Sequence, residues 1–208
     1  MANKDKYYDL EEELLDSKLT IEEILYSKDL KQRKIFVDDI NYLAAFDPVR
    51  HILQYNKEDK GIPVEKRKPI LLYIASNGGS VDAGFEIIDV IKTSKTPVYT
   101  INLGFQYSMG CLIGMAGHKR FAMPSAKFLI HDGSNMVWDS GAKAHDTMKF
   151  YSKLEERTKN YILSNTKITP EEYDKNYRIE WYMFSDEAKE KGLVDYIIGD
   201  DCDIEMII

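Results

Sequence analysis

Two residues of the sequence have the side chains of a serine nucleophile and its base, and each follows a strand-like apolar run. Ser108 lies in Tyr-Ser-Met-Gly, between an apolar segment that ends at Leu103 and another that begins at Cys111. His131 ends the apolar run Phe-Leu-Ile and precedes Asp-Gly. A serine hydroxyl attacks a carbonyl once an imidazole has removed its proton, and backbone amides can stabilise the oxyanion that forms. The two residues therefore predict acyl transfer if the fold brings them together.

Each chemical interpretation has a structural alternative. A serine at a strand-to-helix turn is a favoured N-cap, and the pattern Gly-x-Ser-x-Gly of a nucleophile elbow is not satisfied around Ser108. Residues 77–80 (Asn-Gly-Gly-Ser) join an apolar run to a helical pattern. Paired glycines let backbone amides approach an anionic oxygen, but they also form ordinary turns.

Histidine is the side chain best suited to proton transfer near neutral pH, and the chain has four. His51 and His145 fall in predicted helices among charged residues, and His118 precedes two basic residues. We expect these three to be solvated. His131 alone is preceded by an apolar strand that can hold an imidazole in place, so it is the candidate base.

The elements that must position these residues alternate between strand-like and helical patterns. Strand-like runs lie at residues 34–37, 70–75, 98–103, 128–131 and 193–198, and helical patterns at 81–91, 144–154, from 170 onward and at 186–191. Unbroken apolar runs such as 70–75 suit strands that are buried on both faces. The alternation predicts an α/β fold with a mostly parallel sheet. Such sheets bind ligands at the carboxyl ends of their strands, where the glycine turn, Ser108 and His131 all lie.

Length and composition indicate one domain. We expect a helical N-terminal arm at 1–30 with a capping box at Thr20 and Glu23, a domain at 31–200 and a tail at 201–208. The formal charge of −7 argues against nucleic acid as a partner. No apolar run is long enough to span a bilayer, and Cys111 and Cys202 lack the spacing of metal ligands. These features favour a soluble cytoplasmic protein without a metal site or a membrane partner.

Five blocks of the sequence resemble the proteolytic subunit of the Clp protease in order and spacing. They are residues 77–84, 108–110, 119–124, 130–131 and 187–195. The resemblance covers roughly residues 33–198, and five blocks in order are far more specific than any one of them. It implies a serine peptidase with the spiral α/β core of the Clp protease and crotonase-like fold. A strand-and-helix handle is expected to protrude at about residues 135–165.

The resemblance also assigns roles to individual residues. Ser108 matches the nucleophile and His131 the general base, which replaces the capping interpretation of the serine. Gly79 and Met109 match the residues whose amides form the oxyanion hole. The family holds its substrate as an added β-strand, and the backbone positions implied for this contact are Gly79, Val81 and Ser134.

Two positions depart from the family pattern. Counting back from residues 187–195 without a gap places Glu180 where the family has the aspartate of its triad. Glutamate can orient a histidine, but its extra methylene requires the backbone to lie farther back. The alternatives are that Asp174 or Asp132 orients the histidine, or that Glu180 is only a surface carboxylate. Asp132 and Gly133 also stand where the family has Gln-Pro, so that wall of the cleft is expected to differ.

The family implies partners as well. Its subunits form two stacked heptameric rings, a tetradecamer that encloses the active sites, and an AAA+ Clp ATPase unfoldase feeds it unfolded proteins and peptides. The chain has no Gly-x-x-x-x-Gly-Lys-Ser/Thr motif, so we expect no cofactor of its own and ATP use by the partner. Two other functions remain open. One is a catalytically impaired ring subunit with a structural or partner-selecting role, and the other is an acyl-coenzyme A hydratase or isomerase of the crotonase-like fold.

Overall fold

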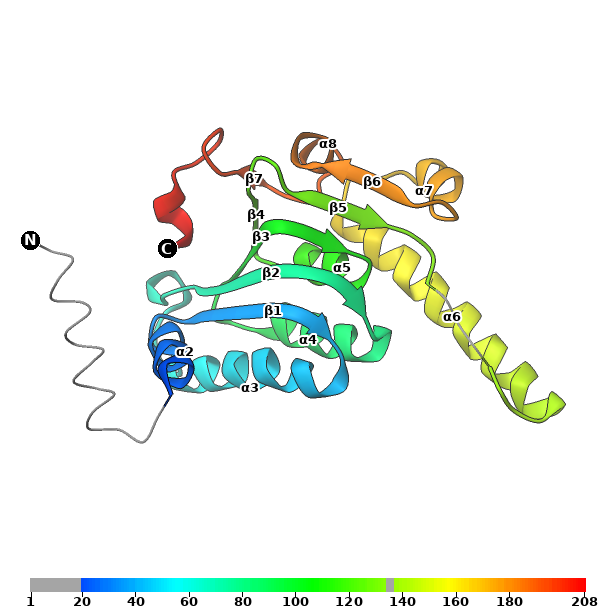
Figure 1. The fold of residues 1–208 in the computed structure, drawn as a ribbon, viewed down its shortest axis with the longest axis horizontal. Coiled ribbons are helices and arrows are strands. Elements are labelled where there is room, and N and C mark those ends of the chain that lie inside the picture. Colours follow the sequence, from blue (N-terminus) through cyan, green and yellow to red (C-terminus); the bar gives the residue numbers. More distant parts are fainter. Residues whose placement is uncertain (1–19, 134–136) are drawn as a thin grey trace, which may run out of the picture.

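The computed structural model describes residues 20–133 and 137–208, which form helices around one seven-stranded sheet (Figure 1). The strands are β1 (Lys34–Ile40), β2 (Ile70–Gly79), β3 (Val98–Tyr107), β4 (Lys119–Ala122), β5 (Lys127–Ile130), β6 (Trp181–Phe184) and β7 (Tyr196–Ile197). The helices are α2 (Ile21–Lys31), α3 (Tyr42–Glu58), α4 (Val81–Thr93), α5 (Met109–Met115), α6 (Gly141–Asn165), α7 (Pro170–Asn176) and α8 (Ser185–Glu190), with short 3-10 helices η1 (Val64–Lys66) and η2 (Ile204–Ile207). The strand order is β1-β2-β3-β4-β7, and only β6, which pairs with β5, is antiparallel to its neighbour. The prediction of an α/β fold with a mostly parallel sheet is confirmed.

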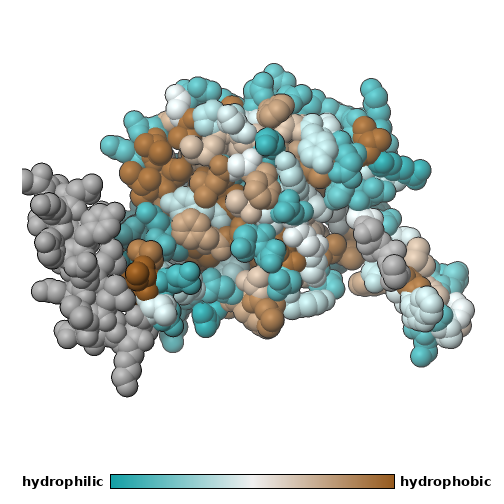
Figure 2. Space-filling model, viewed as in Figure 1, coloured by the Kyte–Doolittle hydropathy of each residue, from teal (hydrophilic) through white to brown (hydrophobic). Residues whose placement is uncertain are grey.

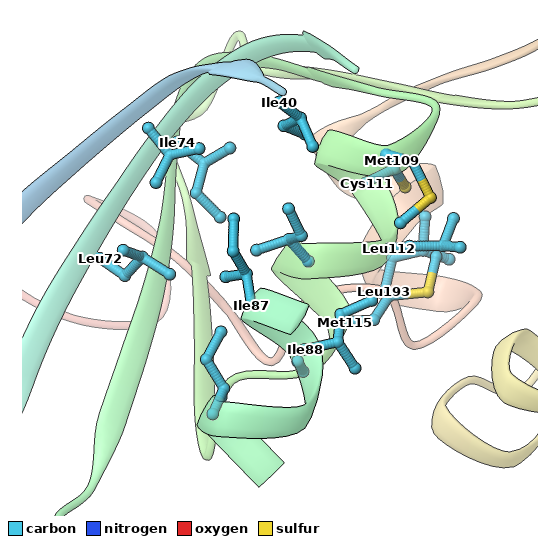
Figure 3. Packing of buried hydrophobic residues seen from close by; sticks show 14 of the residues in the cluster. Ile40, Leu72, Ile74, Ile87, Ile88, Met109, Cys111, Leu112, Met115 and Leu193 are labelled. Atoms are coloured by element: carbon cyan, nitrogen blue, oxygen red, sulfur yellow. The ribbon is translucent and has the colours of Figure 1, made fainter. Parts of the chain in front are cut away.

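Alternating residues of β2 are buried on opposite faces of the sheet. Ile70, Leu72 and Ile74 face the main core, which α3, α4 and α5 complete. Figure 3 shows Leu72 and Ile74 beside the buried side chains of α4 and α5. Leu71 and Tyr73 belong to a smaller cluster on the other face, which η2 covers with Ile207. Burying one such side chain stabilises the fold by about 1.5–3 kcal/mol. The unbroken apolar run is therefore needed because both faces of this central strand are covered.

Strand β3 serves two different neighbours along its length. Its first half pairs with β4 as far as Asn102, and its second half pairs with β5 from Phe105 onward. The fully buried Asn102 holds the branch point, since its amide donates to the carbonyl of Lys127 and its side-chain oxygen accepts from the amide of Gly104. This branch separates β5 from β4 and leaves β5 a free edge on which β6 pairs.

The segment before β1 is part of the folded body from residue 20 onward. The predicted capping box is present, because Thr20 and Glu23 exchange hydrogen bonds at the start of α2. Tyr26 of α2 contacts α3 through the ring of His51, which is only 8% exposed. The expectation that His51 is solvated is therefore wrong, because the packing of α2 on α3 covers it. Residues 1–19 of the expected arm lie outside the described residues.

Two segments differ in how they join this body. Helix α6 is 25 residues long, roughly 37 Å, and its first half projects from the body where a handle is expected (Figure 1). The C-terminal segment instead packs on the sheet, and Figure 2 shows apolar side chains gathered around it. The run at 193–198 forms a shorter strand than expected, because Leu193 and Val194 are buried in the core before β7 begins. No helix of the described residues is long and apolar enough to cross a membrane.

Candidate active site

Three parallel strands end at the same edge of the sheet, and the predicted site residues follow them. Gly79 ends β2, Ser108 follows β3 and His131 follows β5. A cleft of about 710 Å³ opens at this edge. The predicted site residues that line it are Gly79, Val81, Ser108, Met109 and His131. The structure thus brings these five together, while Ser134 lies outside the described residues.

Ser108 is the single residue between β3 and α5, and its backbone is strained. Its φ of 53° and ψ of −123° lie where residues other than glycine are rare, at a cost of about 1–3 kcal/mol. The amide of Ser108 donates to the carbonyl of Leu129 on β5 at 3.0 Å, which holds this turn. Although Ser108 occupies the N-cap position of α5, its side chain makes no capping hydrogen bond. Capping therefore does not account for a strained serine at the mouth of the cleft.

The glycine turn packs directly against this serine. A side chain on Gly78 would begin 2.7 Å from Cβ of Ser108 and 3.2 Å from the amide nitrogen of Met109. One on Gly79 would begin 2.1 Å from the carbonyl oxygen of Ile40. Both glycines have positive φ, 98° and 150°. Only glycine fits at position 78, where the turn packs against Ser108 and Met109, and Gly79 lines the same cleft as these two residues.

Antiparallel pairing of β5 with β6 explains how Glu180 reaches the histidine. Ile130 is paired with Trp181, so the next residue after β5 lies opposite the residue before β6. These are His131 and Glu180, and Nδ1 of the histidine lies 2.9 Å from Oε1 of the glutamate. An imidazole that donates its Nδ1 proton to a carboxylate presents Nε2 as a proton acceptor. The imidazole is 26% exposed, so it is held by the fold yet open to the cleft.

The other two candidate carboxylates have different partners. Asp174 forms an ion pair with Lys159 of α6. Asp132 is exposed, and its backbone amide donates to the carbonyl of Tyr177 at 2.7 Å. Of the three carboxylates, only Glu180 contacts the imidazole of His131 in the structure.

The serine and the histidine are not joined in this single chain. Within residues 20–133 and 137–208, the hydroxyl of Ser108 has no hydrogen-bond partner and His131 is bonded only to Glu180. Hydrogen bonds of this kind are often long in free enzymes and tighten when substrate binds. A ring contact joins β3 to β6 close to the site, since Tyr107, the residue before Ser108, meets Tyr182 of β6 edge-on at 5.7 Å.

A thiol lies close to the serine but is unsuited to nucleophilic attack. Cys111 follows Ser108 in α5, and its amide donates to the serine carbonyl at 3.0 Å. The side chain is fully buried, and this burial raises the pKa of the thiol. Because the thiolate is the reactive form, Cys111 is inert at neutral pH.

One wall of the cleft could not be predicted from local sequence, apart from the helical pattern at residues 144–154, which lies in α6. Tyr151 and Leu154 of that pattern line the cleft, together with Tyr173 of α7 and Tyr177, the C-cap residue of this helix. The rings of Tyr173 and Tyr177 are stacked at 5.2 Å, and burial raises the pKa of Tyr173 to about 12. These tyrosines are one helical turn apart, a spacing that many surface helices share, so only the packing of α7 reveals their place.

The fold and the cleft are those of a peptidase with a serine at a strand-to-helix elbow, and comparisons with known proteins agree. The family model described as Clp protease matches residues 19–201. The ATP-dependent Clp protease proteolytic subunit 1 of Bacillus cereus (strain ATCC 10987 / NRS 248) is 33% identical over 177 residues, which cover 84% of this chain and 89% of that protein. The chain belongs to the Clp protease family of serine-type peptidases.

Proposed function

We propose that the chain is the proteolytic subunit of an ATP-dependent Clp-type endopeptidase with Ser108, His131 and Glu180 as its catalytic triad. The observation that carries the proposal is the 2.9 Å contact between His131 and Glu180 beside a cleft that also holds the strained Ser108. The resemblance of five sequence blocks and the family match support the same roles. In this proposal Glu180 orients His131, the role that the family's aspartate has.

The proposed reaction begins when Nε2 of His131 takes the hydroxyl proton of Ser108 and Oγ attacks the peptide carbonyl. The amides of Gly79 and Met109 stabilise the oxyanion. His131 then gives the proton to the leaving amine, which leaves an acyl ester on the serine. Water, deprotonated by the same nitrogen, hydrolyses this ester and restores the hydroxyl. Glu180 stays ionised throughout, holds the Nδ1 proton and stabilises the imidazolium.

The substrate in this proposal is an extended peptide or a segment of an unfolded protein. The extended peptide forms main-chain hydrogen bonds with the backbone at Gly79 and Val81. Because these bonds involve only the main chain, they hold the peptide without regard to its sequence. Ser134, which lies outside the described residues, is proposed from the family resemblance as a further substrate-binding position. Gly79 and Val81 line the same cleft as Ser108, which supports this mode of substrate binding.

The proposal includes self-assembly and an ATPase partner. The related protein from Bacillus cereus is named as a subunit of an ATP-dependent protease. On α6, Met148 is 50% and Phe150 60% exposed, and contact with further copies of the chain would bury them. We therefore propose stacked heptameric rings in the cytoplasm, served by an AAA+ Clp ATPase unfoldase. ATP is used by that partner, and no cofactor is assigned to this chain.

A second candidate is an impaired ring subunit that contributes structure or partner selection. The observation that favours it is the missing hydrogen bond between Ser108 and His131 in the described residues. In that case the chain assembles with an active relative and reacts slowly itself.

Labelling with a fluorophosphonate probe tests the proposal against this alternative. We expect the purified protein to be labelled at Ser108 and to cleave a short fluorogenic peptide without ATP. The variant Ser108→Ala should assemble normally, take no label and lose activity by a factor of about 10⁴ or more. A correctly assembled protein that takes no label would support the impaired subunit. Folded substrates should be degraded only when the ATPase and ATP are added.

A further inference from the structure

Helix α7 holds the segment that carries Glu180, and it is attached to the projecting helix α6. Lys159 of α6 forms an ion pair with Asp174 of α7. The same ammonium group lies 5.5 Å from the centre of the Tyr173 ring. Tyr173 is 7% exposed and anchors α7 in the core. One lysine thus contacts both a charged and an aromatic side chain on the same turn of α7.

The other end of α7 reaches the candidate base by two routes. The ring of Tyr177 stacks on Tyr173, and the carbonyl of Tyr177 accepts the amide of Asp132, the residue after His131. Shortly beyond Tyr177 the chain reaches Glu180, which contacts Nδ1 of the imidazole. The backbone after the histidine and its carboxylate partner are therefore both held by the C-terminal end of α7.

We propose that Lys159 is a positioning residue for the pair of His131 and Glu180, through which helix α6 sets the activity of the site. The inference rests on the proposed function, because it acts through the triad named there. Lys159 is not among the residues that line the cleft, so the role proposed for it does not involve contact with substrate. Its effect is on geometry, where an error of about 1 Å can lower turnover as much as 100-fold. An exposed ion pair with no such role would leave turnover unchanged.

The lysine can be tested with variants that separate charge from packing. Lys159→Met keeps the apolar stem but removes the charge, and Lys159→Arg keeps the charge. Lys175→Met is the matched control, because Lys175 is an exposed lysine of α7 that forms no ion pair within residues 20–133 and 137–208. We expect Lys159→Met to lower kcat about tenfold with little change in KM for a short peptide. Lys159→Arg should recover most of the loss, and Lys175→Met should behave as the parent.

A double-variant cycle shows whether the lysine acts through Glu180. In a Glu180→Gln background, Lys159→Met should cause no further loss, because the contact that it positions is already gone. An equal loss in both backgrounds, or full activity of Lys159→Met in the parent, would overturn the inference. If Glu180→Gln loses activity while Lys159→Met hydrolyses the peptide at the parent rate, only the positioning role is overturned. If Glu180→Gln also hydrolyses it at the parent rate, the proposed triad is overturned as well. Should Lys159→Met fail to assemble, Asp174→Asn breaks the same ion pair from the other side and must reproduce the loss.

Discussion

Two histidines in this chain lie beside a carboxylate, one at the cleft and one inside the body. Nδ1 of His131 is 2.9 Å from Glu180, a residue 49 positions away in the sequence. Nε2 of His51 is 3.2 Å from Asp47, one turn earlier in the same helix. The pairs have similar chemistry, so proximity of an imidazole to a carboxylate does not by itself define an active site.

The difference lies in which ring nitrogen is engaged and in what surrounds the other. At His51 the engaged nitrogen is Nε2, which also lies 3.1 Å from the hydroxyl of Tyr26, and the ring packs on Tyr55. This imidazole joins α2 to α3. At His131 the carboxylate contacts Nδ1, so Nε2 is the nitrogen that takes the proton of Ser108 in the proposed reaction. A buried histidine with satisfied partners stabilises the fold, whereas one left open on a single side can transfer protons.

Alanine at each histidine is the most direct way to break this comparison. His131→Ala should lower peptide hydrolysis by a factor of about 10⁴ or more while the melting temperature stays near that of the parent. His51→Ala should instead cost about 1–3 kcal/mol of stability and leave the activity of the folded protein unchanged. Assays with a fluorogenic peptide measure the activity of both variants, and thermal unfolding measures their stability. Equal losses of activity would show that the comparison is mistaken.

The carboxylate partners should differ in the same way. Glu180→Gln should lower turnover by a factor on the order of 10³, because an amide cannot stabilise the imidazolium. Oligomer size and expression should not change. Steady-state kinetics and sedimentation of the variant provide the check, with Asp47→Asn as the control within α3. A nearly silent Glu180→Gln would mean that the 2.9 Å contact is only a surface pairing.

Shortening the acid sharpens the role of its length. Glu180→Asp draws the carboxylate back by about 1.5 Å, the length of one carbon–carbon bond, so the contact with His131 is lost unless the backbone moves. We expect turnover to fall between about tenfold and 100-fold. Rates that rise above the parent would show that glutamate is a handicap and that this backbone accommodates the family's aspartate.

The smallest expected effect concerns Tyr26, whose hydroxyl contacts the imidazole of His51. Burial, and then the carboxylate of Asp47, raise the pKa of Tyr26 from 10.0 to about 12. The folded chain holds this proton more tightly than the unfolded chain, so the stabilisation is complete below pH 10 and lost as the pH rises to about 12. Tyr26→Phe should cost less than about 1 kcal/mol at pH 8. It should also flatten the fall in stability between pH 10 and 12, and an unchanged alkaline profile would rule Tyr26 out as its source.

Much of the fold and half of the site were predictable from local sequence. The unbroken apolar run of β2, the helical spacing of α4 and the capping box at Thr20 and Glu23 act over a few residues, so periodicity alone shows them. Ser108 and His131 stand out for the same reason, because each follows a strand that the pattern predicts. The five matching blocks then supplied the candidate roles.

Tertiary structure decided what depends on register and packing between distant segments. The four residues of β6 are all apolar, so the sequence shows no alternation there, yet the antiparallel register of β6 with β5 places Glu180 against His131. The packing of α2 on α3 buries His51, which local charge made look solvated. The ion pair between Lys159 of α6 and Asp174 of α7 likewise joins two separate helices, and the periodicity of neither helix predicts that contact. Local patterns determine which face of an element is apolar, but only the assembled sheet determines which residues meet across it.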